Sequence, residues 1–236
     1  MCAISPAKSL KSSKPFKKDC FQSHKAVIFE IVSPIPENKE IEAALKSVDD
    51  GKIRVEGNTV YFDSPDTCID LGGIAKGYVA DRLKEYFVEQ GCRSACINLG
   101  GNVCLVGRRE DGKLWNVGLQ MPFADRGELL TTIETEDECV ISAGIYERYF
   151  ESDGVIYHHI MDPATGYPAD SGLNMVTVIG NNGTEADALS TIGIVLGQEE
   201  TEKLIRNNGI DVEIIFTDSE NNMRFYPESF KDGKDK

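Results

Sequence analysis

The sequence predicts an α+β fold, with largely antiparallel sheets and a few packed helices. Short apolar runs follow one another through the centre of the chain, separated by turn residues rather than helices, as in an antiparallel meander. Helical periodicity is confined to segments on either side of these runs. The 236 residues suffice for a sizeable core, so we expect a single domain over residues 25–236. A mobile tail rich in lysine and serine is expected over residues 1–24.

The first third of the chain predicts a helix, a hairpin and a second helix. Apolar residues at helical spacing indicate an amphipathic helix over residues 38–48. Strands over residues 52–55 and 59–62 flank a short glycine-containing turn and predict a hairpin. A strand over residues 68–71 then leads through paired glycines into a helix that ends at Gly91.

The remainder of the chain predicts mainly strands, with one further pair of helices. The expected strands cover residues 95–99, 103–106, 114–119, 129–133, 139–142, 175–179, 211–217 and 223–226. A hairpin turn is expected at residues 152–154. Helices are expected over residues 185–196 and 199–207, between the strands over residues 175–179 and 211–217.

Charge and cysteine content limit the possible functions. The formal net charge of −14 opposes binding to a nucleic-acid backbone, so we expect no nucleic-acid partner. An acidic protein that binds an anionic nucleotide needs a metal ion or helix N-termini instead of a basic surface. The seven cysteines are odd in number and contain no C-x-x-C pair, which argues against a zinc site or disulfide framework. We expect buried free thiols, such as Cys96 within an apolar run.

Two glycine turns are candidate binding loops. Residues 70–78 read Asp-Leu-Gly-Gly-Ile-Ala-Lys-Gly-Tyr, so a strand passes through two glycines into a helix start. Backbone N–H groups there can approach a diphosphate closely, although a tight turn without a ligand explains the pattern equally simply. Residues 98–102 read Asn-Leu-Gly-Gly-Asn, which fits an ordinary hairpin or a second loop near the first.

Two further segments carry groups suited to catalysis and metal binding. Within residues 157–166, His158 and His159 are adjacent on a predicted strand, so only one can face a given cleft and serve as a general base. Within residues 184–191, Asp187, Ser190 and Thr191 project oxygens from one face of a helix, as Mg²⁺ ligation requires. The spacing of Thr184 and Asp187 also fits a capping box, which would leave Asp187 a structural role.

Taken together and in this order, the four segments closely resemble the ApbE family of FAD:protein FMN transferases. The resemblance runs from about Glu37 to the C-terminal region, and the part upstream of the first motif is short compared with the family. It implies an ApbE-like fold and an enzyme that cleaves FAD, attaches FMN through a phosphoester to a threonine of another protein, and releases AMP. Two alternatives within the family are a non-catalytic FAD-binding protein and an FAD pyrophosphatase that yields FMN and AMP.

The resemblance also assigns roles to individual residues. It implies that the backbone carbonyl of Ala75 and the side chains of Asp187, Ser190 and Thr191 hold Mg²⁺ against the FAD diphosphate. His159 would assist deprotonation of the acceptor threonine. The residues implied to line the site of FAD, which is the substrate, are Gly72, Lys76, Tyr78, His159 and Met161.

Family habit further implies a partner and a compartment. The acceptor would carry a Ser/Thr-Gly-Ala-Thr-type sequence on a subunit of a membrane redox complex. Family members are typically membrane-anchored lipoproteins that face outside the cytoplasm. The basic N-terminus shows no apolar segment of a secretion signal, so the sequence itself indicates no export.

Overall fold

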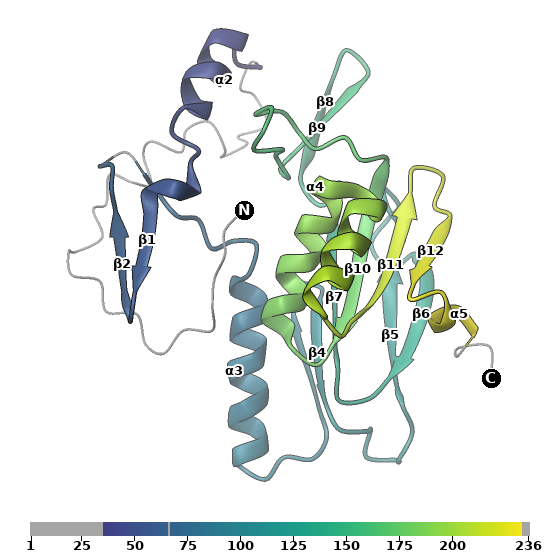
Figure 1. The fold of residues 1–236 in the computed structure, drawn as a ribbon. Coiled ribbons are helices and arrows are strands. Elements are labelled where there is room, and N and C mark those ends of the chain that lie inside the picture. The colour runs from purple at the N-terminus through teal and green to yellow at the C-terminus, as the bar shows by residue number, and fades with distance from the viewer. Residues whose placement is uncertain (1–34, 66, 233–236) are drawn as a thin grey trace. The chain divides into compact units, whose positions relative to one another are not determined.

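The structure is a computed structural model, and it describes residues 35–65 and 67–232. The chain divides into two compact units (Figure 1). The first contains residues 35–70 and 161–168, and the second contains residues 71–160 and those from 169 onward. The predicted tail over residues 1–24 lies outside the described residues, and the single domain over residues 25–236 stays a prediction.

The first unit contains the predicted helix and hairpin. The helix α2 (Asn38–Leu45) begins with a capping box between Glu37 and Glu40. A short 3₁₀ turn, η2 (Asp50–Lys52), leads into β1 (Ile53–Glu56), which pairs in antiparallel register with β2 (Thr59–Phe62). The helix and the hairpin are therefore confirmed.

The loop 161–168 packs against α2 within the first unit. Gly166 has a φ of 74°, and a Cβ at this position would lie 2.6 Å from Ile41 Cγ2. The Tyr167 hydroxyl donates a hydrogen bond of 2.7 Å to Asn38 Oδ1. Inside the loop, Asp162 accepts hydrogen bonds from the Ala164 N–H at 2.9 Å and the Thr165 hydroxyl at 3.2 Å. These hydrogen bonds stabilise the Asp-Pro turn and attach the loop to α2.

The second unit is built on a six-stranded antiparallel sheet with the order β12-β11-β10-β7-β4-β3. The sheet strands are β3 (Ala95–Leu99), β4 (Asn102–Val106), β7 (Cys139–Gly144), β10 (Leu173–Gly180), β11 (Glu213–Asp218) and β12 (Met223–Tyr226). Two separate hairpins are formed by β5 (Trp115–Gln120) with β6 (Leu129–Thr135), and by β8 (Tyr149–Ser152) with β9 (Val155–His158). The predicted α+β class with antiparallel sheets is confirmed.

Helices cover one face of this sheet, and the β5–β6 hairpin covers the other (Figure 1). The covering helices are α3 (Ala75–Glu89) and α4 (Gly183–Asn208), whereas the short α5 (Ser229–Asp232) contributes Phe230 to the apolar layer on the hairpin side. Ile141 and Val176 face α3 and α4, whereas Leu105 and Val140 face the hairpin. The alternation of side chains along each strand thus supplies two apolar layers from one sheet.

The two predicted C-terminal helices are parts of one kinked element, because α4 bends at Gly197, whose φ is 76°. The predicted strand over residues 68–71 is wrong. The Leu71 carbonyl accepts the N–H groups of Ile74 and Ala75, so Leu71 belongs to the turn that opens α3. Within the described part of the chain, no helix combines the length and the apolar character needed to cross a membrane.

The prediction of free thiols is wrong for Cys104 and Cys139, which form a disulfide between directly opposed residues of β4 and β7. Both residues are fully buried. Their separation of 35 residues hides the pair in the sequence, because their proximity depends on sheet pairing. The expectation of a buried Cys96 is also wrong. Cys96 lies on the edge strand β3 and faces away from the helices, since its neighbour Ile97 packs towards them.

Removing this disulfide is expected to destabilise the second unit. The bond closes a loop across 35 residues, for which the chain-entropy model gives a stabilisation of about 4 kcal/mol. The variant Cys104→Ser/Cys139→Ser should therefore unfold at a lower urea concentration than the oxidised protein. Urea unfolding followed by circular dichroism measures the difference, with exposed Cys96→Ser as the matched control. Equal midpoints for the double variant and the oxidised protein would contradict the contribution assigned to the disulfide.

Candidate functional site

The glycine turn before α3 exposes the start of that helix. The Leu71 carbonyl accepts hydrogen bonds from Ile74 N–H at 3.1 Å and Ala75 N–H at 2.9 Å, which closes the turn. Ile74 is the N-cap residue, and its side chain provides no capping hydrogen bond. The residues implied to bind FAD on this segment, Gly72, Lys76 and Tyr78, are all exposed. The predicted glycine turn into a helix N-terminus is confirmed, whereas a role of these residues in binding FAD stays a prediction.

Gly77 in the first turn of α3 brings this helix against the beginning of α4. Its N–H group donates a hydrogen bond of 2.9 Å to Asp187 Oδ2. A Cβ atom on Gly77 would lie 2.1 Å from the Gly183 carbonyl oxygen and 2.8 Å from Asp187 Cβ. Only glycine permits so close an approach, so this residue fixes the distance between the two helices. The contact also satisfies an N–H group that has no partner within its own helix.

Asp187 is the buried carboxylate at the centre of the site. Its side chain is nearly inaccessible, since the residue is 4% exposed. While Gly77 binds Oδ2, the other oxygen, Oδ1, accepts a hydrogen bond of 2.9 Å from Asn102 Nδ2. Within residues 35–65 and 67–232, no lysine, arginine or histidine forms an ion pair with Asp187. Among the described residues, the donors to this carboxylate are therefore neutral groups alone.

The capping alternative for Asp187 is wrong. Asn182 is the N-cap of α4, and its side chain accepts the Glu185 N–H at 2.9 Å. Asp81 of α3 holds the same helix start through Gly183 N–H at 2.7 Å and Thr184 N–H at 2.8 Å. The Thr184 hydroxyl also donates to Asp81, at 2.6 Å. Asp187 is therefore available for another role.

Two hydroxyl groups lie next to Asp187 on α4. Ser190 is fully buried, and its hydroxyl donates a hydrogen bond of 2.9 Å to the Asp187 carbonyl. The Thr191 hydroxyl donates to the same carbonyl at 3.4 Å. A Cβ on Gly73 would lie 3.8 Å from Thr191 Oγ1, so the glycine turn reaches this hydroxyl. Both oxygens keep lone pairs that can bind a cation.

The structure thus brings together three of the four candidate segments. The first contributes the turn and the start of α3, which contains Ala75, and the second contributes Asn102 at the beginning of β4. The fourth contributes the hard oxygen groups of Asp187, Ser190 and Thr191. Sequence reasoning identified residues 98–102 as a loop, but it missed the amide of Asn102 as a partner of Asp187. It missed Asp81 altogether, and no local signal marks that residue.

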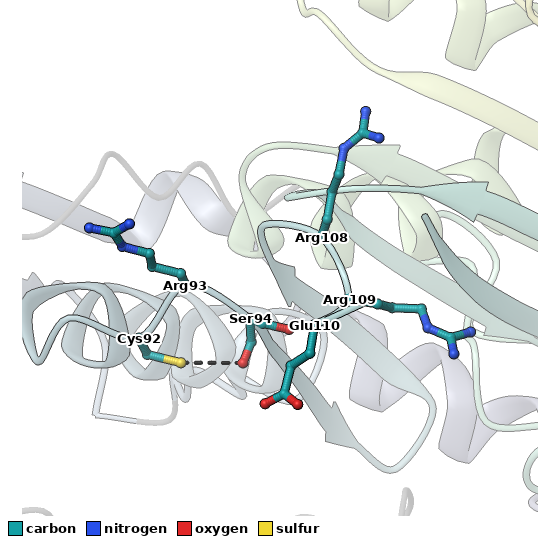
Figure 2. A pocket seen from close by; sticks show the side chains of 6 residues that line it. All are labelled: Cys92, Arg93, Ser94, Arg108, Arg109 and Glu110. Atoms are coloured by element: carbon teal, nitrogen blue, oxygen red, sulfur yellow. Dashed lines mark hydrogen bonds between the residues drawn. The ribbon is translucent and has the colours of Figure 1, made fainter. Parts of the chain in front are cut away.

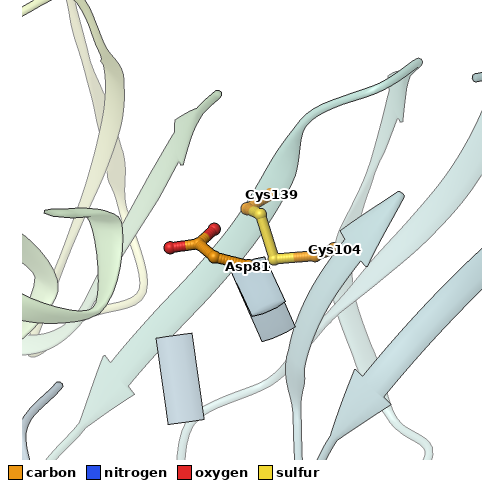
Figure 3. Close-up of side chains that lie close together, drawn as sticks. All are labelled: Asp81, Cys104 and Cys139. Atoms are coloured by element: carbon orange, nitrogen blue, oxygen red, sulfur yellow. A yellow bond between two sulfur atoms is a disulfide. The ribbon is translucent and has the colours of Figure 1, made fainter. Parts of the chain in front are cut away.

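Asp81 also lies beside the disulfide (Figure 3). Its carboxylate oxygen and the sulfur atoms of Cys104 and Cys139 lie within 4.8 Å of one another. The two sulfurs are bonded to each other, and both Asp81 oxygens accept hydrogen bonds from the start of α4. These groups therefore have a structural role. Asp81 joins α3 to the start of α4, and the disulfide beside it joins β4 to β7.

The two adjacent histidines have different environments. His158 is 3% exposed, its Nε2–H donates to the Ala169 carbonyl at 3.0 Å, and its Nδ1 accepts the Ile160 N–H at 3.3 Å. His159 is half-buried, and its Nδ1–H donates to the Arg148 carbonyl at 3.3 Å. Among the described residues no group hydrogen-bonds His159 Nε2. His159 rather than His158 therefore offers a ring nitrogen that can accept a proton.

Burial lowers the pKa of both histidines. Neutral imidazole is thus the favoured state of His159 at neutral pH, as a general base requires. Met161, the remaining residue implied to contact FAD, belongs to the first unit, where it forms a bridge with Pro168. Its role in binding FAD stays a prediction.

A separate depression of about 500 Å³ is lined by Cys92, Arg93, Ser94, Arg108, Arg109 and Glu110 (Figure 2). The three guanidinium groups point in different directions. Arg108 pairs with Glu136, and Arg109 pairs with Asp111 at 3.3 Å. The arginines therefore do not converge on one anion, and the depression is a weaker candidate site than the group around Asp187.

The chain has an antiparallel sheet covered by two helices, with a buried carboxylate where those helices meet, and its sequence matches a known protein family. The model of the ApbE family matches residues 21–216, and the chain belongs to this family. An FAD:protein FMN transferase from Klebsiella pneumoniae is 38% identical over 184 residues, covering 77% of this chain and 56% of the relative. One from Vibrio cholerae is 32% identical over 197 residues, covering 84% of this chain and 59% of the relative.

Solved structures agree with this assignment. The crystal structure of the ApbE protein from Thermotoga maritima has a TM-score of 0.74 and 33% identity, with 84% of this chain and 64% of that chain covered. The flavin transferase ApbE from Vibrio cholerae has a TM-score of 0.69 and 29% identity, with coverages of 85% and 64%. The chain thus spans less than two thirds of the length of these relatives, and the ApbE-like fold is confirmed.

Proposed function

We propose that the protein is a Mg²⁺-dependent FAD:protein FMN transferase. The observation that carries the proposal is Asp187, a carboxylate that is 4% exposed and has no cationic partner among the described residues. Buried charges in proteins are normally paired with an opposite charge or bound to a metal ion. The relatives are named FAD:protein FMN transferases, and we propose that the metal ion serves this reaction.

The donor set fits magnesium. Asp187 supplies a carboxylate, and Ser190 and Thr191 supply hydroxyl oxygens one helical turn further along α4. The Ala75 carbonyl, two residues before Gly77, would complete the protein ligands. Mg²⁺ prefers such hard oxygen ligands, and it commonly uses only a few of them together with water and phosphate oxygens. When bound, the ion would neutralise the charge that develops on the FAD diphosphate during cleavage.

The chain's own groups would complete the reaction. The exposed start of α3 supplies the positive end of a helix dipole, which favours a bound diphosphate. As the acceptor threonine oxygen forms a bond to the FMN phosphorus, the bond from that phosphorus to the AMP oxygen breaks. His159 Nε2 would take the hydroxyl proton, because the Arg148 carbonyl holds the hydrogen on Nδ1.

The acceptor and the compartment are also part of the proposal. We propose an acceptor with a Ser/Thr-Gly-Ala-Thr-type sequence on a subunit of a membrane redox complex, and activity outside the cytoplasm. The disulfide between Cys104 and Cys139 supports the second point, since disulfides persist in oxidising compartments.

The test measures transfer of the fluorescent FMN group from FAD to an acceptor protein. Purified protein is incubated with FAD, Mg²⁺ and a protein that carries a Ser-Gly-Ala-Thr sequence, and the products are separated on a denaturing gel. A fluorescent acceptor band that requires Mg²⁺ is expected. Release of FMN and AMP without the band would instead indicate an FAD pyrophosphatase, and FAD binding without either product would indicate a non-catalytic protein.

The pH dependence of transfer should report the titration of His159. Because burial lowers its pKa from 6.5, the neutral base persists below that pH, and kcat should stay level above 6.5 and fall only under it. His159→Asn should lower kcat by roughly 100-fold or more and remove this fall. Rate measurements from pH 5 to 8 at saturating FAD test both points. An unchanged profile in the variant would exclude His159 as the base.

A further inference from the structure

The amide of Asn102 binds the carboxylate at the centre of the proposed metal site. Asn102 is 1% exposed, and its Nδ2 lies 2.9 Å from Asp187 Oδ1. The other carboxylate oxygen is held at the same distance by the Gly77 N–H group. Each oxygen thus receives one neutral donor, from β4 on one side and from α3 on the other.

This arrangement fixes the plane of the carboxylate without neutralising its charge. A carboxylate offers about four lone-pair sites, so two remain when two donors are bound. A lysine or arginine in place of Asn102 would compete with a cation for the same charge, whereas an amide does not. The hydrogen bonds therefore restrict rotation of Asp187 and keep it able to bind a metal.

Asn102 is itself held in a rigid frame. It shares one face of β4 with Cys104, two residues further on, and this face packs towards the helices. The register pairs between β4 and β7 are Val103–Val140 and Cys104–Cys139, and the disulfide adds a covalent bond to the second pair. A Cβ on Gly183 would lie 3.1 Å from Cys104 Sγ, so β4 also contacts the start of α4.

We propose that Asn102 is a positioning residue, whose amide orients the Asp187 carboxylate for Mg²⁺. The inference rests on the proposed function and goes beyond it, since it assigns a role to a residue outside the proposed metal ligands and flavin contacts. Removing the amide allows the carboxylate to rotate, which weakens the metal site. Chemistry at the occupied site is unaffected, because Asn102 acts only through Asp187.

The test uses Asn102→Leu, which keeps the approximate volume of the side chain and removes the donor. The Mg²⁺ concentration that half-saturates FAD binding, measured by calorimetry, should rise about 10-fold, as expected for loss of a hydrogen bond to a charged group. The Mg²⁺ concentration for half-maximal transfer should rise equally, whereas kcat at saturating Mg²⁺ should stay within about 2-fold of the wild-type value. Asn102→Ala is the second variant, and it should show the same pattern.

The control is Thr177→Val, which removes the hydroxyl of a fully buried residue and its hydrogen bond of 2.8 Å with Ser142 on the same sheet. It should lower the unfolding midpoint and leave the Mg²⁺ constants unchanged. A fall in kcat at saturating Mg²⁺ with unchanged constants in both Asn102 variants would overturn the positioning role. If FAD binding by the wild-type protein does not depend on Mg²⁺, the metal site itself is wrong, and the role of Asn102 is wrong with it.

Discussion

Replacing Asp187 by alanine is expected to lower FMN transfer by at least about 100-fold, because the variant lacks the only carboxylate in the proposed metal site. The remaining oxygen groups, the Ala75 carbonyl and the hydroxyls of Ser190 and Thr191, carry no charge and bind Mg²⁺ weakly by themselves. The loss should appear in the rate at physiological Mg²⁺ and should be only partly recovered at high Mg²⁺. Initial rates of acceptor labelling across a Mg²⁺ series measure the effect.

The matched control for this variant is Glu185→Ala. Glu185 lies in the first turn of the same helix, but its side chain is exposed. Its removal deletes the same charge at nearly the same place and should change the rate by less than about 2-fold. Equal losses for Glu185→Ala and Asp187→Ala would show that general charge near α4 governs the rate, against the proposed site.

Gly77→Ala is expected to destabilise the protein by roughly 3 kcal/mol or more, a large effect for one methyl group. The added Cβ would lie 2.1 Å from the Gly183 carbonyl oxygen and 2.6 Å from the Gly183 carbonyl carbon. Both atoms belong to the backbone and cannot rotate away, so α3 and α4 must separate. Urea unfolding followed by circular dichroism measures the loss, and Mg²⁺-dependent FAD binding should weaken with it.

Gly73→Ala is the control for this steric argument. Among the residues that the structure describes, a Cβ there would lie within 4 Å of Thr191 Oγ1 alone, at 3.8 Å, which is an ordinary van der Waals distance. The unfolding midpoint should therefore stay close to the wild-type value. If Gly77→Ala unfolds at the same urea concentration as Gly73→Ala, the close contact between the helices is not a feature of the folded protein.

Most of the fold could be predicted because the elements have clear local signals. The helix before Gly91 and the strand over residues 223–226 follow from periodicity and from the turn residues that bound them. The wrong strand over residues 68–71 shows the limit of this approach. An apolar run before paired glycines fits a strand as well as it fits a turn. In the structure it forms a turn, which the Leu71 carbonyl closes.

The site could be predicted in part. The spacing of Asp187 and Thr191 indicated a shared helix face, and both residues do lie on α4. The spacing of Thr184 and Asp187 also allowed a capping role, which the capping of α4 by Asn182 excludes. Asn102 and Asp81 were missed because their partners are 85 and 102 residues away, respectively. Such contacts depend on tertiary packing, and residue type alone does not reveal them.

The disulfide was missed for a related reason. An odd number of cysteines without close spacing gave no pairing signal, yet β4 and β7 place Cys104 directly opposite Cys139. The pair lies beside Asp81, which holds the start of α4. The covalent bond and the polar contacts thus support the same region of the second unit.

The central claim is that Asp187 binds a metal ion next to the FAD diphosphate. The most direct test is X-ray diffraction from crystals grown with FAD and Mn²⁺. This ion takes the place of Mg²⁺ and scatters anomalously. An anomalous peak is predicted about 2.2 Å from an Asp187 carboxylate oxygen and within reach of Thr191 Oγ1 and the FAD diphosphate. The same crystals of Asp187→Ala should show no peak there. A wild-type map in which the diphosphate is bound and the metal lies away from Asp187 would contradict the account.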